Sequence, residues 1–176
     1  MPPRNSRRSG RRRRADAPPS EDVLVRTYTA PDYPAVRDLW RGAGLTIGPS
    51  DRPRELERTR RRDPDLFLVA EWGGRLVGAV LGRFDGRRGW INHLAVRATA
   101  RHLGIGTRLM AEVERRLARK GCAKVNLHIF PENAAVCEFY GRIGYGRRPF
   151  IFMDKWLRGP RAARPPPRRG PRLGAR

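Results

Sequence analysis

The stretch W-I-N-H-L-A-V-R-A-T-A-R-H-L-G-I-G-T-R-L at residues 90–109 joins a strand pattern to a helix pattern through a short loop that carries glycine. Gly104 and Gly106 open the helix, and neither has a side chain that would keep a ligand from the backbone. The first N–H groups of a helix have no partner within it, and the positive end of the helix dipole lies behind them. The loop therefore predicts a binding site for an anion such as a diphosphate.

The helix that follows is expected from about Gly104 to Lys120 and has one apolar face. Its apolar residues recur at intervals of four: Ile105, Leu109, Val113 and Leu117. Arg and Glu fill the other face, and Gly121 ends the helix. This pattern is typical of a helix that packs one side against a core.

The rest of the chain predicts an alternation of strands and helices. Strands are expected where apolar, β-branched and aromatic residues alternate with polar ones, at residues 23–28, 66–71, 75–84, 90–96, 123–130 and 149–156. Further helices are expected at 31–42, 52–62 and 131–143. Asp51 is expected to cap the helix at 52–62. The expected order is βααβββαβαβ, with no internal repeat.

The charge of the chain is strongly positive and unevenly distributed. Of 176 residues, 39 are Lys or Arg and 17 are Asp or Glu, which gives a formal net charge of +22. Residues 1–20 and 158–176 each carry seven arginines among Pro and Gly, with almost nothing apolar to bury. We expect these two tails to be disordered and residues 21–157 to form a single folded domain. The tails would contact nucleic acid weakly, or would only be solvated.

Other classes of protein and site lose support because their signatures are missing. No apolar run approaches the roughly 18 residues that a membrane span needs, and no secretory leader is recognisable. Cys122 and Cys137 form neither a disulfide framework nor a zinc or redox motif. The three histidines lie in different predicted elements, so we expect no metal site. These features favour a cytoplasmic protein without a membrane partner.

Two other kinds of phosphate-binding loop do not fit the sequence. The motif at 104–106 is followed by Thr107, Arg108 and Leu109, which breaks the G-x-G-x-x-G fingerprint of dinucleotide-binding proteins. No Gly-Lys-Ser/Thr sequence occurs, so the loop of nucleoside triphosphatases is missing as well. Both dinucleotides and nucleoside triphosphates therefore lose support as ligands.

Five motifs in a fixed order carry a resemblance to a known family: L-A-V at 94–96, R-x-x-G-x-G at 101–106, Asn133, Phe139-Tyr140, and G-R-I-G-Y at 141–145. Over roughly residues 22–156 the chain resembles the GCN5-related N-acetyltransferase (GNAT) superfamily. The resemblance implies an α/β (α+β) domain with a central, mixed, mostly antiparallel twisted sheet flanked by helices. It also implies an enzyme that transfers an acetyl group from acetyl-CoA directly to a primary amine of a small molecule or protein.

The same resemblance assigns residues to acetyl-CoA. Leu94, Ala95 and Val96 would form the strand whose backbone hydrogen-bonds the pantetheine arm. Residues of the loop would surround the pyrophosphate, chiefly through backbone amides: Arg101, His102, Gly104, Ile105, Gly106 and Thr107. Asn133 would contact the pantetheine or lie beside the thioester.

Tyr140 would be the general acid in this resemblance. An amine that attacks a thioester expels a thiolate, and a phenol O–H placed at the sulfur can donate a proton to it, an effect worth typically ~10²–10⁴ in rate. The alternative is that Tyr140 is a core aromatic residue whose hydroxyl is satisfied by the backbone.

The residue that would accept the proton of the amine departs from the family pattern. Many relatives carry a Glu on the fourth strand, whereas here no Asp or Glu occurs between Asp85 and Glu112. Asn92 and His93 occupy this region, and a neutral imidazole is a suitable base near pH 7. A water chain, an acceptor that arrives deprotonated, and a purely structural His93 are the alternatives.

The acceptor is expected in a groove bounded by the first two helices and the last strands. Asp32, Asp51 and Glu55 would hold a cationic amine there, or would only cap helices and pair with arginines. The competing function is that of a nucleic-acid-binding protein that uses its basic tails and whose folded domain is not catalytic. Residues 151–156 are apolar enough to pair between the subunits of a homodimer.

Overall fold

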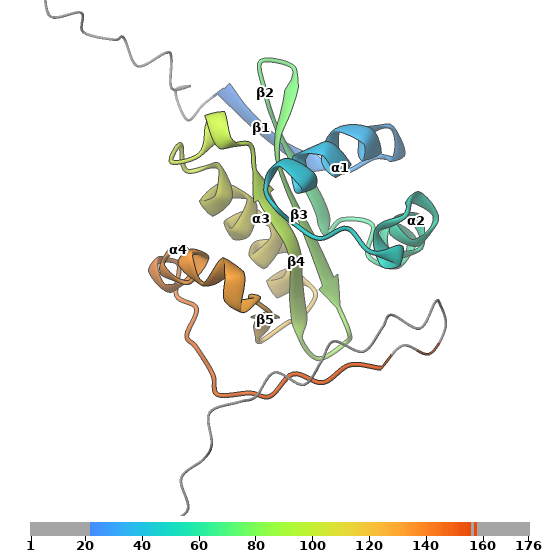
Figure 1. The fold of residues 1–176 in the computed structure, drawn as a ribbon. Helices are drawn as coiled ribbons and strands as arrows, with labels where there is room; N and C mark the ends of the chain where they lie inside the picture. Colours follow the sequence, from blue (N-terminus) through green and yellow to red (C-terminus); the bar gives the residue numbers. More distant parts are fainter. Residues whose placement is uncertain (1–21, 156, 158–176) are drawn as a thin grey trace, which may run out of the picture.

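The computed structural model describes residues 22–155 and residue 157 (Figure 1). The expected tails at 1–20 and 158–176, and Trp156, lie outside the described residues. The strands are β1 Val23–Thr27, β2 Phe67–Trp72, β3 Arg75–Phe84, β4 Gly89–Val96 and β5 Val125–Leu127. The α-helices are α1 Tyr33–Gly42, α2 Pro53–Arg62, α3 Ile105–Arg119 and α4 Cys137–Arg142. Short 3₁₀ helices are η2 Ala30–Asp32, η3 Pro49–Asp51, η4 Ala98–Ala100 and η5 Pro131–Val136.

The strands form one sheet in the order β1-β2-β3-β4-β5. The first four strands are antiparallel neighbours, and β5 lies parallel to β4. The connection between β2 and β3 is the Gly73-Gly74 turn, where both residues have positive φ. The prediction of a mixed, mostly antiparallel sheet flanked by helices is confirmed.

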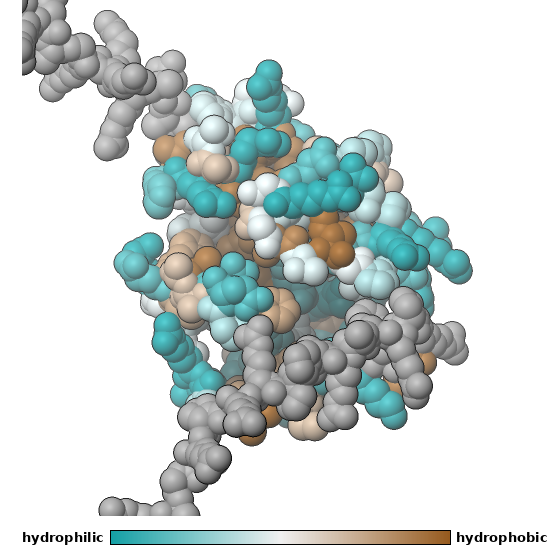
Figure 2. Space-filling view, in the orientation of Figure 1, coloured by the Kyte–Doolittle hydropathy of each residue, from teal (hydrophilic) through white to brown (hydrophobic). Residues whose placement is uncertain are grey.

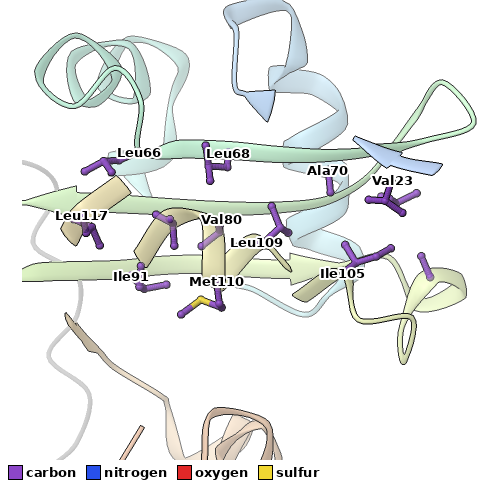
Figure 3. Close-up of a cluster of buried hydrophobic side chains, with 13 residues drawn as sticks. Val23, Leu66, Leu68, Ala70, Val80, Ile91, Ile105, Leu109, Met110 and Leu117 are labelled. Carbon is purple, nitrogen blue, oxygen red and sulfur yellow. The ribbon is translucent and has the colours of Figure 1, made fainter. Parts of the chain in front are cut away.

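Each face of the sheet is covered by its own hydrophobic core. The face toward α3 is drawn in Figure 3, where side chains of α3 and of the strands interlock, including Leu68, Val80, Leu109 and Met110. The opposite face is covered by α1 and α2 around the fully buried side chains of Trp40 and Leu56. The four-residue spacing in α3 builds the first core, because it places the large apolar side chains of the helix on one side.

Three glycines of the sheet allow α3 to lie close to the strands. A Cβ built on Gly78 would lie 2.9 Å from Leu109 Cδ1, and one on Gly82 would lie 2.6 Å from Val113 Cγ2. A Cβ on Gly89 would likewise lie 2.8 Å from Cδ1 of Leu117. These contacts follow successive turns of α3, so the helix is fixed along the length of β3 and β4.

The prediction of a strand at 149–156 is wrong for residues 149–155, the part of this segment that the structure describes. Residues 149–155 have no strand, and the apolar side chains of this segment are between 66% and 90% exposed: Phe150, Ile151, Phe152 and Met153. A strand needs a partner edge, and its nearest neighbour in chain order, β5, spans only three residues. The strand expected at 123–130 is correspondingly shorter than the sequence pattern indicated.

The helix expected at 131–143 is divided into η5 and α4. Asn133 breaks it, since its φ of −102° and ψ of 16° are not helical. The helices expected at 31–42, 52–62 and 104–120 are present, with ends shifted by one or two residues. In residues 22–155 no helix is long and apolar enough to cross a membrane.

Candidate active site

Strands β4 and β5 separate after three paired residues. β5 pairs with Gly89, Trp90 and Ile91, and no described strand pairs with the same edge of β4 from Asn92 to Val96. Figure 1 shows α4 on the side of β4 where β5 ends. A strand with a free edge can form backbone hydrogen bonds with an extended ligand, as it would with another strand.

A β-bulge lies within this unpaired part of β4. Ala79 of β3 faces Ala95 and Leu81 faces Asn92, so two residues of β4, His93 and Leu94, stand opposite one residue of β3. His93 has a φ of +52°, a conformation uncommon for a residue other than glycine. The bulge therefore sets the direction in which His93 leaves the strand.

The loop after β4 presents a row of free backbone donors. Among the described residues, the amides of residues 102–107 have no hydrogen-bond acceptor, and the first satisfied amide is that of Arg108, which donates to the Gly104 carbonyl at 2.9 Å. His102 and Gly104 have φ of +63° and +74°, and the residues between and after them do not. Alternating signs of φ turn successive N–H groups toward one point, an arrangement that can bind an anion.

The side chains of this loop separate into buried and exposed ones. Ile105 is 1% exposed and belongs to the core, so only its amide is available to a ligand. Arg101, His102 and Thr107 are exposed, and Arg101 Nε donates to the Val96 carbonyl at 3.3 Å. The guanidinium of Arg101 thereby lies between the end of β4 and the loop.

Gly106 is where β4, α3 and α4 meet. A Cβ at this position would lie 3.4 Å from Phe139 Cζ and 3.7 Å from Val96 Cγ2. Because Phe139 precedes Tyr140, this contact brings α4 and its tyrosine to the end of β4 and the start of α3. The motif at 139–140 thus meets the two neighbouring motifs at 94–96 and 101–106 in the structure.

Tyr140 is half-buried against the core and carries a free hydroxyl. Its ring packs edge-on against Phe139 and Tyr145, with centroid distances of 5.1 and 5.6 Å. Burial raises the pKa of Tyr140 to about 12, so the phenol keeps its proton near neutral pH. No described residue hydrogen-bonds this hydroxyl, whereas Tyr145 Oη donates to Glu114 at 2.7 Å. The alternative of a hydroxyl satisfied by the backbone therefore does not hold within the described residues.

His93 lies on the other face of β4, between α1 and η3. Its ring is 4.6 Å from that of Trp40, and Trp40 Nε1 donates to the His93 carbonyl at 3.1 Å. His93 Nε2 lies 3.4 Å from Oδ1 of Asp51, which is within ion-pair distance. The two groups do not have the alignment of a hydrogen bond. The imidazole is thus held by one aromatic ring and faces one carboxylate.

Asp51 does not cap α2, contrary to the sequence expectation. Its side chain is 5% exposed, and Oδ2 accepts the Gly48 N–H at 2.7 Å, so it closes η3 instead. Burial opposes the charged form, yet the nearby His93 imidazole and the hydrogen bond from the Gly48 amide outweigh this and hold the pKa of Asp51 below its usual value. Asp51 is accordingly an ionised carboxylate in a buried setting.

The other two acids expected at the acceptor groove are engaged by arginines. Asp32 accepts two hydrogen bonds from Arg26, each of 2.7 Å, and Glu55 pairs with Arg58 at 3.1 Å. A shallow hollow beside Asp51 is lined mainly by hydroxyl and guanidinium groups, with Ser50, Glu55, Arg58, Thr59, Arg62 and Arg83 around it. Figure 2 shows hydrophilic side chains over much of this view, with hydrophobic residues visible between them.

The remaining residues expected at the site lie along the same strand and helix. Leu94 and Val96 pack on the core toward α3, whereas Ala95 is buried on the opposite face. Asn92 is half-buried in β4 and Asn133 half-buried in η5. Sequence reasoning missed Trp40 as a contact of His93, and no local pattern signals it, because α1 and β4 are far apart in the chain.

These features fit coenzyme A as a ligand. The free amides of the loop at 102–107 match a diphosphate, and the open edge of β4 matches the amide groups of a pantetheine arm. Cys122 and Cys137 are half-buried free thiols. Within the described residues no group of three His, Cys, Asp or Glu side chains is arranged to hold a metal ion.

Comparison with known proteins agrees with this geometry. Residues 33–145 match the sequence model of the Acetyltransferase (GNAT) family. The chain is 37% identical over 133 residues to an acetyltransferase of Pectobacterium atrosepticum, which covers 76% of this chain and 94% of that protein. An acetyltransferase of Sodalis glossinidius is 36% identical over 73% of this chain and 91% of that protein.

Solved structures share the fold at low sequence identity. The PaiA N-acetyltransferase of Thermoplasma acidophilum in complex with coenzyme A superposes with a TM-score of 0.62 at 18% identity, over 70% of this chain and 89% of that one. The aminoglycoside N-acetyltransferase AAC(6')-Iy in complex with coenzyme A gives a TM-score of 0.64 at 16% identity, over 77% and 95%. The family match over residues 33–145 and the two acetyltransferase relatives show that the chain belongs to the GNAT family of acetyltransferases, enzymes whose acyl donor is acetyl-CoA.

Proposed function

We propose that this acetyltransferase transfers the acetyl group directly to a primary amine, with His93 as the general base and Tyr140 as the general acid. The observation that carries the proposal is the row of free amides at residues 102–107, which lies next to the unpaired edge of β4 and to Phe139, the residue before Tyr140. Leu94–Val96 would hold the pantetheine arm along that edge. Acetyl-CoA, when bound there, supplies the acetyl group as a thioester.

Two protons have to move in this reaction. The attacking amine forms a C–N bond and loses a proton, and the C–S bond breaks to release a thiolate that needs one. His93 is half-buried on β4 and takes the amine proton on a ring nitrogen. Tyr140 keeps its proton until a thiolate forms, since burial raises its pKa to about 12, and its hydroxyl is not engaged by any described residue. Tyr140 thus has the protonation state that the role of general acid requires.

The acceptor would enter from the side of α1 and η3, where His93 leaves the sheet. We expect a primary amine on a small molecule or on a protein. A panel of polyamines, amino acids, aminoglycosides and peptide N-termini, with released thiol as the readout, would identify it. Absence of thiol release with every acceptor, in a protein that binds acetyl-CoA, would argue against direct transfer to an amine.

Replacement of His93 by Gln tests the base. We expect kcat/KM for the best acceptor to fall by roughly 10²-fold or more, with the Kd for acetyl-CoA unchanged. The matched control is His128→Gln, because His128 is exposed and its ring makes tilted contacts with Trp90 and Phe152. Equal rates for the two variants would remove His93 from the reaction.

Contact of the tails with nucleic acid is a separate expectation. It depends on residues 1–20 and 158–176, whose arginines would give binding that weakens steeply with salt. Binding of a DNA duplex by the full chain and by residues 21–157, at low and high salt, tests it. Binding that is independent of the tails or insensitive to salt would contradict it.

A further inference from the structure

We propose that Asp51 is the positioning residue of the base: its carboxylate holds His93 Nε2 and so leaves Nδ1 as the nitrogen that takes the proton of the acceptor amine. The inference rests on the proposed role of His93 and deepens it. Asp51 lies in η3, far from β4 in the sequence, and its Oδ1 lies 3.4 Å from His93 Nε2. A carboxylate on one ring nitrogen with the reacting group on the other is the arrangement that fixes a catalytic imidazole.

The surroundings hold both partners in place. Asp51 is tied to the Gly48 amide at 2.7 Å through Oδ2, which leaves Oδ1 to face the imidazole. His93 is fixed from the other side by Trp40, through ring contact and through a hydrogen bond to its carbonyl. The ring of His93 is therefore bounded by Trp40 on one side and by the Asp51 carboxylate on another.

The pair lies in a setting where such a carboxylate has a large effect. Both side chains are largely removed from water, with exposures of 22% for His93 and 5% for Asp51. The charged group that acts on Asp51 from β3 is Arg83, while α1 contributes the uncharged Trp40. A buried carboxylate next to an imidazole favours the tautomer that carries its proton on the facing nitrogen.

Asp51→Asn reverses this preference for a reason that the structure supplies. The Gly48 N–H needs an acceptor, so the amide oxygen of the introduced asparagine stays with it and the NH₂ group turns toward His93 Nε2. Nε2 then has to accept a hydrogen bond, and the ring proton moves to Nδ1. Nδ1 loses the lone pair that takes the proton of the amine, and the base fails while the fold stays intact.

The experiment combines ¹⁵N NMR of the histidine rings with kinetics. In the full-length wild-type protein, at a pH where the ¹⁵N shifts show the His93 ring to be neutral, we expect His93 to carry its proton on Nε2. In Asp51→Asn we expect it on Nδ1, with a fall in kcat/KM of roughly 10²-fold or more and an unchanged Kd for acetyl-CoA. The ring signals of His93 are identified by their loss in His93→Gln.

The matched control is Asp63→Asn. Asp63 is also buried, at 6% exposure, and accepts a backbone N–H from Phe84 at 3.4 Å, but it faces no histidine. It should leave both the tautomer of His93 and the rate unchanged. Asp51→Glu, which keeps the carboxylate, should recover part of the rate that Asp51→Asn loses.

The outcomes separate this inference from the proposed function. A wild-type His93 with its proton on Nδ1 would overturn the inference without any variant, even if Asp51→Asn does not fold. An Asp51→Asn protein with the wild-type tautomer and rate would overturn it too, while a slow His93→Gln enzyme would still support His93 as the base. A fully active His93→Gln enzyme would instead reject the proposed function.

Discussion

Gly104→Ala should weaken the binding of acetyl-CoA, and the structure offers a closely matched control for it. Gly104 precedes α3 with a φ of +74°, and Gly121 follows α3 with a φ of +82°. A Cβ would meet nothing within 4 Å at either position. Alanine in this left-handed conformation costs roughly 1–2 kcal/mol, so both variants should lose similar stability, with Tm lower by about 3–8 °C.

Only Gly104 lies at the end of α3 that carries the free amides. If the alanine introduced there relaxes toward negative φ, the alternation of φ that begins at His102 is lost and the amides no longer converge. Loss of one hydrogen bond to a charged diphosphate is worth about 1.5–3 kcal/mol, which raises Kd roughly 10- to 100-fold. Calorimetric titration with coenzyme A measures this, and the same Kd in Gly104→Ala and Gly121→Ala would refute the assignment of the loop.

Three further predictions follow from the contacts. Tyr140→Phe should lower kcat by about 10²–10⁴-fold without changing the Kd for acetyl-CoA. Tyr145→Phe is the control and should keep kcat, because it loses only its hydrogen bond to a glutamate of α3. Equal kcat values in the two variants would reject Tyr140 as the general acid. Gly82→Ala should reduce the free energy of unfolding by about 1–3 kcal/mol, because the added Cβ would overlap a valine of α3. Gly42→Ala adds a Cβ with no atom within 4 Å and should raise the free energy of unfolding slightly. Urea unfolding of both variants measures the difference. Hydrogen bonds from two arginines of α3 lower the pKa of Glu112 to about 2. The stability that Glu112 adds is therefore present above its ordinary pKa of 4.5 and is lost as the pH falls toward 2. Glu112→Gln should flatten the dependence of Tm on pH between these values, and an unaltered profile would contradict the ion pairs.

Local patterns in the sequence were sufficient for the loop and for α3. The spacing of Ile105, Leu109, Val113 and Leu117 fixes one face of the helix, and the glycines before it fix how it begins. Both depend on residues within one or two turns of one another. The free backbone amides at 102–107 could therefore be predicted from the sequence, and their binding of a diphosphate stays a prediction.

Contacts between distant segments could not be predicted in this way. The bulge in β4 depends on the register with β3, and the alternation of residues in 90–96 contains no sign of it. The pair of His93 and Asp51 joins β4 to η3, so Asp51 looked like an ordinary helix cap. The expected strand at 149–156 failed for the same reason: its own residues favour a strand, but a strand forms only where another edge is available.

The bulge explains how one strand can serve both substrates. Leu94 and Val96 pack toward α3 and the loop that would hold the donor, whereas His93 faces α1 and η3, where the acceptor would enter. Side chains alternate along a strand, so a shift of one residue exchanges the faces of every residue beyond it. The extra residue opposite β3 lets His93 take an uncommon φ while the register of Ala95 with Ala79 is kept. The positions of the proposed base and of the proposed pantetheine edge are therefore set by the same irregularity in β4.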